Sequence, residues 1–232
     1  MTRKLRDVLI VTADDYGIRQ TTEPILRLVR AGKIDRVAVL IRYVSPEQAV
    51  ALKAAGVKID LHLELIGLLK SGEQVSESAL WRGINFLFRF TLGLVTVKKV
   101  KAEWQDQIRR FEEVFGCLPD GLNSHEHLHF FPPFFTVFLG LAQQYTVSYI
   151  RFGSNGMLTG LHRSLIGKLL FLFWQQTRGL YSKTNLTTSD YLVSLDWLDD
   201  VVSFGEQLPA GSVELVVHPE REKDYHTVLK YL

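Results

Sequence analysis

The stretch Val8-Leu9-Ile10-Val11-Thr12-Ala13-Asp14-Asp15-Tyr16-Gly17 begins as an apolar run of strand length and ends in two adjacent acids. Like charges held close together in a partly desolvated site resist joint ionisation, so a chain keeps such a pair where a metal ion or a shared proton neutralises it. One acid could cap the following helix, but a single cap leaves the other acid unexplained. We therefore predict a strand over residues 8–13 that carries Asp14 and Asp15 to a functional site.

Apolar runs of strand length alternate with stretches of helical period through the rest of the chain. Further strands are predicted over residues 37–41, 57–63, 121–125, 147–152 and 213–217, with residues 190–193 allowing one more, and helices over 21–31, 46–55, 102–115, 134–145 and 224–232. This alternation predicts an α/β fold with a parallel sheet, open or closed. Because no internal repeat, low-complexity tract or linker interrupts it, we expect one domain over residues 1–232, with a helical insertion at about 75–100.

Composition narrows the class of function. The net charge of +2 is too small to indicate nucleic-acid binding. Cys117 is the only cysteine, which excludes an internal disulfide and favours a reducing compartment. Basic residues precede the first apolar run, but that run is too short for a signal peptide and ends in acids in place of a small-residue cleavage site. We therefore expect a cytoplasmic protein that is not exported.

Polar residues recur where the predicted strands end. His62 lies at the end of the third strand, His125 ends the fourth, Arg151 lies near the end of the fifth, and His218 follows the last. In α/β folds the carboxyl ends of parallel strands share one edge, where sites form, so these side chains should converge with the acid pair. A single His on an apolar strand is more often a core residue than a ligand. Several His residues together with two acids indicate a metal-dependent enzyme.

The run His125-Glu126-His127-Leu128-His129 matches the H-E-x-x-H pattern of zinc proteases. That chemistry requires a helix, which places residues four apart on one face. Two prolines follow almost at once, so no helix of adequate length fits. In an extended chain the three histidines share one face and Glu126 points away. The sequence leaves open whether His127 or His129 replaces His125 as a ligand.

Four motifs in this order resemble the YdjC family, a group of carbohydrate deacetylases that includes chitooligosaccharide deacetylases and hopanoid-associated proteins. The motifs are Ala13-Asp14-Asp15-Tyr16-Gly17, His62-Leu63-Glu64-Leu65, Asn123-Ser124-His125-Glu126-His127-Leu128-His129-Phe130-Phe131-Pro132 and Val213-Glu214-Leu215-Val216-Val217-His218-Pro219. The resemblance covers nearly the whole chain. It implies an irregular, TIM-barrel-like β/α barrel with mostly parallel strands. It also implies an enzyme that removes the acetyl group of an N-acetylated amino sugar, either an oligosaccharide or a lipid-linked glycan.

The same resemblance implies one divalent metal ion held by Asp15, His62 and His125, with Asp14 as the general base and His218 as an acid or electrophile. Two neutral imidazoles and one carboxylate suit Zn²⁺, Mg²⁺ or another divalent ion, and the sequence does not choose between them. Side chains near the same strand ends are candidates for contact with the sugar: Arg151, Tyr16, His127 and His129.

The chain departs from the family pattern at three acids. Asp60, Glu64 and Glu220 stand where Gly, Thr and Gly are usual in the resembling motifs. The extra acidity bears on substrate preference, and we interpret Glu64 as a residue at an exposed strand end. Two other functions stay open at this point, namely a different metallohydrolase, such as a phosphoesterase or peptidase, and a non-catalytic, membrane-associated sugar-binding protein.

Two stretches, residues 84–95 and 165–174, are unusually apolar. Each falls short of the roughly 20 apolar residues that a membrane-spanning helix needs, and each contains a basic residue, so neither is predicted to span a bilayer. Basic residues flank both stretches, a composition typical of contact with a membrane surface or with a lipid-linked substrate. The alternative is that the two stretches pack on each other or form a homodimer interface.

Overall fold

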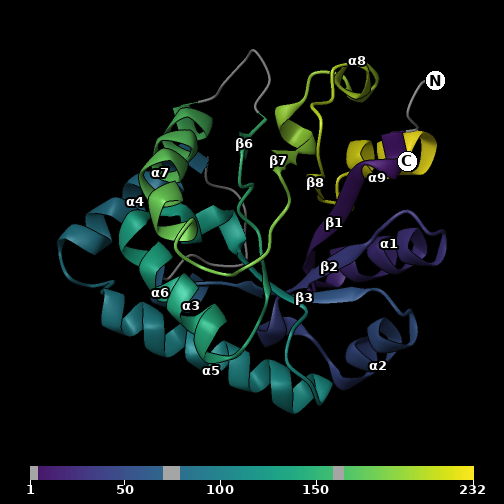
Figure 1. Cartoon of the computed structure of the whole chain (residues 1–232). Coiled ribbons are helices and arrows are strands. Elements are labelled where there is room, and N and C mark those ends of the chain that lie inside the picture. The colour runs from purple at the N-terminus through teal and green to yellow at the C-terminus, as the bar shows by residue number, and fades with distance from the viewer. Residues whose placement is uncertain (1–4, 70–78, 159–164) are drawn as a thin grey trace.

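All eight described strands run parallel in one sheet, in the order β5-β4-β3-β2-β1-β8-β7-β6 (Figure 1). This computed structural model describes residues 5–69, 79–158 and 165–232. The strands are β1 (Leu9–Tyr16), β2 (Arg36–Val39), β3 (Lys58–Leu63), β4 (Gly121–Ser124), β5 (Tyr149–Ile150), β6 (Gly156–Met157), β7 (Tyr191–Ser194) and β8 (Val213–Val217).

The sheet curls into a half-barrel with helices around it (Figure 1). Consecutive strands are neighbours except β5 and β6, and β1 pairs with β8, as the first and last strands of a closed barrel do. The helices are α1 (Arg19–Arg30), α2 (Pro46–Ala54), α3 (Ile66–Leu69), α4 (Ala79–Thr91), α5 (Val97–Phe115), α6 (Pro132–Gln144), α7 (Leu165–Tyr181), α8 (Val201–Glu206) and α9 (Glu222–Tyr231). The predicted α/β, TIM-barrel-like fold with parallel strands is confirmed.

The observed strands agree with the predicted ranges where the apolar run is long, and differ from them at the short strands β5 and β6. Strand β8 coincides with the predicted range 213–217, because its apolar run is bounded by a Gly-Ser pair and a His-Pro pair. Strand β5 is much shorter than the predicted range 147–152, since only Tyr149 and Ile150 pair with β4. Strand β6 was not predicted, because its two residues carry no periodicity.

Four helices, α1, α5, α6 and α9, start two to five residues earlier than predicted. Helix α5 begins at Val97, five residues earlier than predicted, because the Thr96 side chain caps it by accepting from the Lys99 N–H at 3.3 Å. Helix α1 begins at Arg19, so Thr21 does not cap it. The Thr21 hydroxyl instead donates to the Asp15 carbonyl at the site. Helix α4 occupies much of the predicted helical insertion, and residues 75–78 of that prediction lie outside the described residues.

The two unusually apolar stretches are helices α4 and α7, which pack on each other. Their inner faces meet at Phe131, whose ring centroid lies 5.3 Å from that of Phe86 on α4 and 5.5 Å from that of Phe173 on α7. Phe131 follows the His-rich segment directly, so this aromatic cluster supports the loop that carries it. Within the described residues no helix is both long and apolar enough to cross a membrane.

Candidate metal centre and active site

Strand β1 ends in a bulge that brings two adjacent acids to the same place. Neighbouring side chains of a regular strand point to opposite faces. Here the pairing of β1 with β2 shifts register within Ala13–Tyr16, and Asp15 has a left-handed backbone with φ of 66°. Thr21 holds the bulge, because its hydroxyl donates to the Asp15 carbonyl at 2.5 Å. As a result, Asp14 and Asp15 lie 3.7 Å and 3.3 Å from Nε2 of His62.

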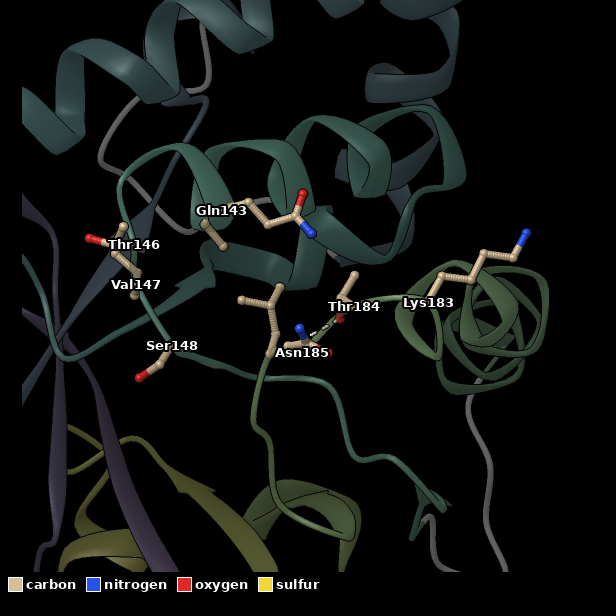
Figure 2. Close-up of a pocket in the computed structure, with 9 residues that line it drawn as sticks. Gln143, Thr146, Val147, Ser148, Lys183, Thr184 and Asn185 are labelled. Atoms are coloured by element: carbon tan, nitrogen blue, oxygen red, sulfur yellow. Dashed lines mark hydrogen bonds between the residues drawn. The ribbon is translucent and has the colours of Figure 1, made fainter.

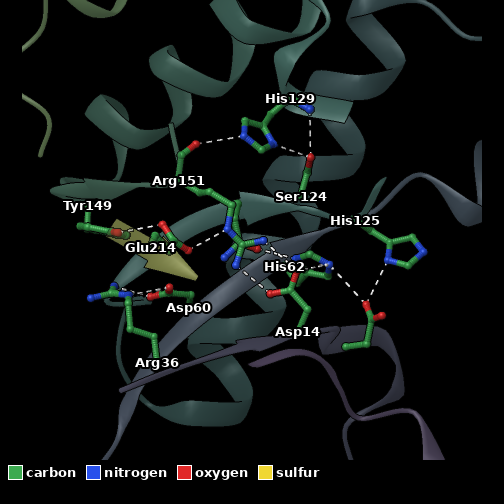
Figure 3. A network of polar contacts seen from close by, with 12 residues as sticks. Asp14, Arg36, Asp60, His62, Ser124, His125, His129, Tyr149, Arg151 and Glu214 are labelled. Carbon is green, nitrogen blue, oxygen red and sulfur yellow. Dashed lines mark hydrogen bonds and ion pairs between the residues drawn. The ribbon is translucent and has the colours of Figure 1, made fainter. Parts of the chain in front are cut away.

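Three side chains from three strand ends form a cluster with metal-ligand chemistry. Asp15 lies near the end of β1, His62 near the end of β3, and His125 directly after β4. Figure 3 labels the two histidines. One donor atom from each lies within 4.8 Å of the others, and Asp15 Oδ1 is 3.0 Å from His125 Nδ1. A carboxylate and two imidazoles form a common donor set for divalent ions. Of the residues that the structure describes, these three could hold a metal ion.

His62 is oriented by a residue that sequence reasoning missed. Its Nδ1 forms a short hydrogen bond with Oδ1 of Asn123, its partner in register on β4. An amide oxygen only accepts, so Nδ1 donates and Nε2 keeps its lone pair toward Asp15. Both side chains are buried, which restricts rotation of the imidazole. The signal was present in the sequence, because a polar Asn on a buried strand requires a partner.

The electrostatics of the cluster favour a positive charge between its members. Burial raises the pKa of Asp15, but His125 and His62 beside it hold that pKa well below its usual range. Burial lowers the pKa of His125, but the Asp15 carboxylate raises it to about 9. Both shifts mean that the Asp15 carboxylate is most stable when a cation faces it. A proton or a metal ion can supply that charge.

Asp14 is held by a buried arginine. The two Nη atoms of Arg151 each donate to one Asp14 oxygen at 2.7 Å, in a bidentate pair (Figure 3). Burial raises the pKa of Asp14, but Arg151 outweighs it with the help of His62, and the pKa is lowered to about 2. The carboxylate is therefore ionised at neutral pH, directly beside the cluster.

A polar network continues from Arg151 through the inside of the half-barrel (Figure 3). Nε of Arg151 donates to one Glu214 oxygen, and the Tyr149 hydroxyl donates to the other, both at 2.8 Å. The Arg36 guanidinium stacks 3.9 Å from the centre of the Tyr149 ring and donates to both oxygens of Asp60. Interiors of parallel barrels are filled mainly by Val, Ile and Leu. This barrel instead contains a column of charges that positions the acid pair.

The charges of the site do not balance. The network and the acid pair contain four carboxylates and two guanidinium groups, those of Asp14, Asp15, Asp60 and Glu214 and those of Arg36 and Arg151. With the neutral histidines that metal binding requires, two negative charges stay uncompensated; without a metal, a proton on His125 offsets one of them. Buried charges are stable only when they are paired or bound to a metal. One divalent cation at the cluster would neutralise the surplus, so the charge and the donor atoms both fit such an ion.

Three of the predicted sugar contacts have no exposed surface. Arg151, Tyr16 and His129 are completely buried, contrary to the predicted contact with substrate. The Tyr16 hydroxyl donates to the Gln48 carbonyl at 2.8 Å. His129 links Nδ1 to the Ser124 hydroxyl at 2.7 Å and Nε2 to the Arg151 carbonyl at 3.0 Å. Tyr16 and His129 therefore hold the backbone around the site, while the Arg151 side chain holds the carboxylates of Asp14 and Glu214.

The His-rich segment is neither the extended strand that we predicted nor an α-helix. Residues His125–Phe130 form a 3₁₀ turn whose second and third residues have left-handed backbones, with φ of 54° and 55°. This kink separates the three histidines. His125 joins the cluster, His129 turns into the core, and His127 lies against Trp197 with ring centroids 5.5 Å apart. The turn thus brings His125, rather than its two neighbours, to the other candidate ligands.

His218 follows β8 at the same edge of the sheet. Its backbone N–H donates to Asp224 at 3.1 Å, and its Nδ1 is buried without a hydrogen-bond partner among the described residues. The pKa values of Asp14 and Asp196 are both lowered. Burial acts to raise them, but nearby groups that include His218 outweigh it. His218 is therefore within electrostatic range of Asp14, while it lies outside the three-residue cluster.

A surface hollow lies at the other end of the sheet (Figure 2). It is lined by residues 142–143 and 146–148, which precede β5, and by residues 183–186, which follow α7. Residues that precede a strand lie at its amino end, so this hollow is remote from the carboxyl-end cluster. Lys183 is the one ionisable side chain among its lining residues. The hollow therefore lacks the acid–base pairs that the cluster offers.

Residues 8–229 match the sequence model of a family described as YdjC-like protein. The chain belongs to the YdjC-like family. The match spans all eight described strands and every residue of the cluster and the network.

Several individual proteins are also similar to this chain in sequence. A chitooligosaccharide deacetylase of Proteus mirabilis is 27% identical over 226 residues, which cover 91% of this chain and 81% of that protein. Carbohydrate deacetylases of Danio rerio and Homo sapiens are 31% and 28% identical, each over 62% of this chain. The chain spans about half the length of these last two relatives, 49% and 47%.

A solved structure supports the fold. A protein of Enterococcus faecalis V583, described as a proposed cellobiose-phosphate cleavage protein, superimposes with a TM-score of 0.58. It is 18% identical, and the superposition covers 90% of this chain and 80% of that one. At this identity the likeness concerns the half-barrel and not its chemistry.

Two of the three acids that depart from the YdjC-like pattern are paired in the structure. Asp60 pairs with Arg36 at 2.5 Å, and Glu64 pairs with Arg42 at 2.7 Å. Glu64 is 1% exposed, so its interpretation as an exposed strand end was wrong. Glu220 is exposed. The extra acidity near the site is therefore largely compensated by arginines.

Proposed function

We propose that this YdjC-like chain is a metal-dependent carbohydrate deacetylase that hydrolyses the N-acetyl group of an amino sugar. The observation that carries the proposal is the cluster of Asp15, His62 and His125, with the ionised Asp14 beside it at the carboxyl edge of a parallel half-barrel. The names of the matched relatives support a carbohydrate as the substrate class.

The chain's own residues can perform the proton transfers of this reaction. A divalent ion bound at the cluster would activate water and polarise the acetyl carbonyl. Asp14 would accept a proton from the attacking water, because Arg151 keeps its carboxylate ionised and fixed. His218 would give a proton to the amine nitrogen as the amide C–N bond breaks. Acetate and the free amino sugar are the products.

The donor set bears on which metal is used. Imidazole nitrogens suit Zn²⁺, whereas Mg²⁺ prefers a shell of oxygen atoms and water. The cluster offers two nitrogens and one oxygen, so we propose Zn²⁺ ahead of Mg²⁺. The amino sugar itself is either a soluble oligosaccharide or a lipid-linked glycan.

Metal content and acetate release, measured together on four proteins, test the proposal. We expect about one divalent ion per chain in the wild type and in the control variant His226→Ala, whose side chain is exposed on α9. His125→Ala, at a partly exposed position, should lose both metal and acetate release from N-acetylated oligosaccharides. Asp14→Asn keeps all three ligands and should retain metal, with release lowered by at least about 100-fold.

Three results would each contradict part of the proposal. A wild-type protein that binds no divalent ion even when Zn²⁺ or Mg²⁺ is supplied would exclude the metal site. An Asp14→Asn variant with near wild-type release would exclude Asp14 as the base. Stoichiometric metal without acetate release from soluble or lipid-linked acceptors would support the site and exclude the reaction.

A further inference from the structure

Exposed apolar side chains are concentrated on two helices and the turn that follows one of them. Among the described residues, fifteen large hydrophobic side chains are exposed, and nine of them lie on or beside α4 and α7. Six lie within residues 84–97, and three lie within residues 169–180. Scattered single apolar residues are ordinary on a protein surface, but a contiguous group of them indicates a binding surface.

The spacing places these side chains on one face of each helix. On α4, Leu87 and Phe88 lie three and four residues after Ile84, and Leu92, directly after the end of the helix, lies four residues after Phe88. On α7, Leu169 and Leu172 are three apart. Residues with this spacing share a helix face. We call these six residues, together with the exposed Lys168 of α7 and the exposed Lys98 and Lys99 at the start of α5, the α4–α7 face.

The fold already uses other residues of these helices: Phe86 lies on the far side of α4 and Trp174 on the far side of α7, while Phe173 lies at the border of the exposed face. Phe86 of α4 and Phe173 of α7 pack on Phe131, and Trp174 is buried with its indole N–H donating to the Gly153 carbonyl at 2.9 Å. The outward apolar residues are therefore not needed for the core. Helix α7 also contacts the His125–Phe130 turn, which carries a candidate ligand.

The two segments that contain α4 and α7 carry basic residues and no acidic ones. Residues 78–102 contain five Lys or Arg and no Asp or Glu, and residues 127–189 also contain five Lys or Arg and no Asp or Glu. Of these, Lys98, Lys99, Lys168 and Arg178 are exposed next to the apolar side chains. All 25 acids of the chain lie outside both segments. The described α4–α7 face therefore combines exposed apolar side chains with basic side chains from two segments that contain no acid.

We propose that the α4–α7 face docks the protein on an anionic lipid bilayer. Apolar side chains that enter the interface and basic side chains that meet anionic headgroups are the two signals that together give stable peripheral binding. A second copy of the chain fits this face poorly. A twofold interface would place the same patch on both subunits and bring Lys98, Lys99 and Lys168 against their equivalents.

Vesicle flotation tests the proposal without any measurement of catalysis, so its result is independent of the proposed deacetylase reaction. The full chain should float with vesicles of phosphatidylcholine and phosphatidylglycerol, bind vesicles of phosphatidylcholine alone much less, and dissociate as salt is raised. Phe88→Ser combined with Leu92→Ser should lower the bound fraction at least about tenfold, since two exposed apolar anchors are lost. Lys98→Gln should lower the binding constant about fivefold.

Matched controls use residues of the same kind elsewhere on the surface. Val50→Ser combined with Leu229→Ser, both exposed apolar positions, and Lys223→Gln, an exposed lysine on α9, should leave flotation unchanged. Equal loss of binding in the controls would overturn the assignment to this face, and so would absence of flotation with anionic vesicles. Light scattering supplies a further check. A wild-type dimer that Phe88→Ser with Leu92→Ser converts to a monomer would show that a second copy, not lipid, covers the face.

Discussion

At the scale of single residues, the hydrogen bond from His62 to Asn123 decides which imidazole nitrogen faces the cluster. Asn123→Ala should weaken metal binding about 10- to 100-fold, because it frees the ring to rotate and to change tautomer. Competition with a metal chelator measures the affinity. Asn155→Ala, at an exposed position, is the control and should bind metal as the wild type does. An affinity within twofold of the wild type for Asn123→Ala would contradict this role.

His127 makes stability depend on pH. Burial and the nearby Arg151 lower its pKa to about 3, and its Nδ1 is buried without a partner among the described residues. The unfolded chain binds a proton at this residue below about pH 6.5, while the folded chain does not until about pH 3. Stability therefore falls as the pH decreases through this window. The loss attributable to His127 should reach about 2 kcal/mol at pH 5.

Urea unfolding at a series of pH values measures this effect. His127→Asn, which does not titrate, should show a smaller decrease in the free energy of unfolding between pH 7 and pH 5. His226→Asn, at an exposed position on α9, should show the wild-type decrease. An unchanged slope in His127→Asn would mean that His127 is protonated in the folded protein.

The candidate ligands could be predicted from the sequence, but their partners were harder to find. Asp15, His62 and His125 stand at strand ends, a position that the sequence itself reveals. Asn123 and Glu214 stand inside apolar strands, where a polar residue signals a buried partner without naming it. Only the fold shows that Glu214 pairs with Arg151, since 63 residues separate them along the chain.

At the scale of secondary-structure elements, β4 begins with a glycine for a steric reason. A Cβ at Gly121 would lie 2.7 Å from both Arg36 Nη2 and Asp60 Oδ1, inside the charged network. Gly121→Ala should lower the free energy of unfolding by about 1–3 kcal/mol, because the ion pair must shift to make room. Chemical denaturation measures the change.

Helix α6 offers the matched control for this substitution. A Cβ at Gly140 would meet nothing within 4 Å, and alanine is the better helix former. Gly140→Ala should therefore leave stability unchanged or raise it by up to about 1 kcal/mol. If both alanine variants behave alike, the network does not require a glycine in β4.

Elements were predictable where their pattern was long enough. Helix α5 has 19 residues and a clear apolar period, so only its start was displaced. The turn over His125–Phe130 could not be predicted, because Glu126 and His127 adopt left-handed backbones although neither is a glycine, and their residue types give no sign of this conformation. The bulge at Asp15 belongs to the same class, and it turned two adjacent acids toward one site.

At the scale of the whole molecule, Arg151 ties together strands that are distant in sequence. It follows β5 and pairs with Asp14 on β1 and Glu214 on β8. Arg151→Met should lower the free energy of unfolding by about 3–5 kcal/mol, because it leaves two buried carboxylates without a counter-charge. Arg151→Lys should also be destabilising, since one ammonium group cannot reproduce the planar fork of donors.

Urea denaturation of both variants tests this role beside Arg109→Met. Arg109 forms an exposed ion pair with Asp106, and such pairs contribute less than about 1 kcal/mol. A loss below 1 kcal/mol for Arg151→Met would mean that the buried carboxylates become protonated at little cost.

The fold class itself was predictable from the alternation of strands and helices. The position of the opening in the half-barrel, between the edge strands β5 and β6, was not predictable, because these two strands are too short to show a sequence pattern.

The short strands on either side of that opening also limit unwanted association. An unclosed sheet presents free N–H and C=O groups, to which a strand of another molecule can add. Here each edge strand is two residues long, and Thr187 already pairs with the outer side of β5 through two backbone hydrogen bonds of 2.7 Å and 2.9 Å. The barrel can therefore stay open while offering almost no template for the growth of aggregated β-structure.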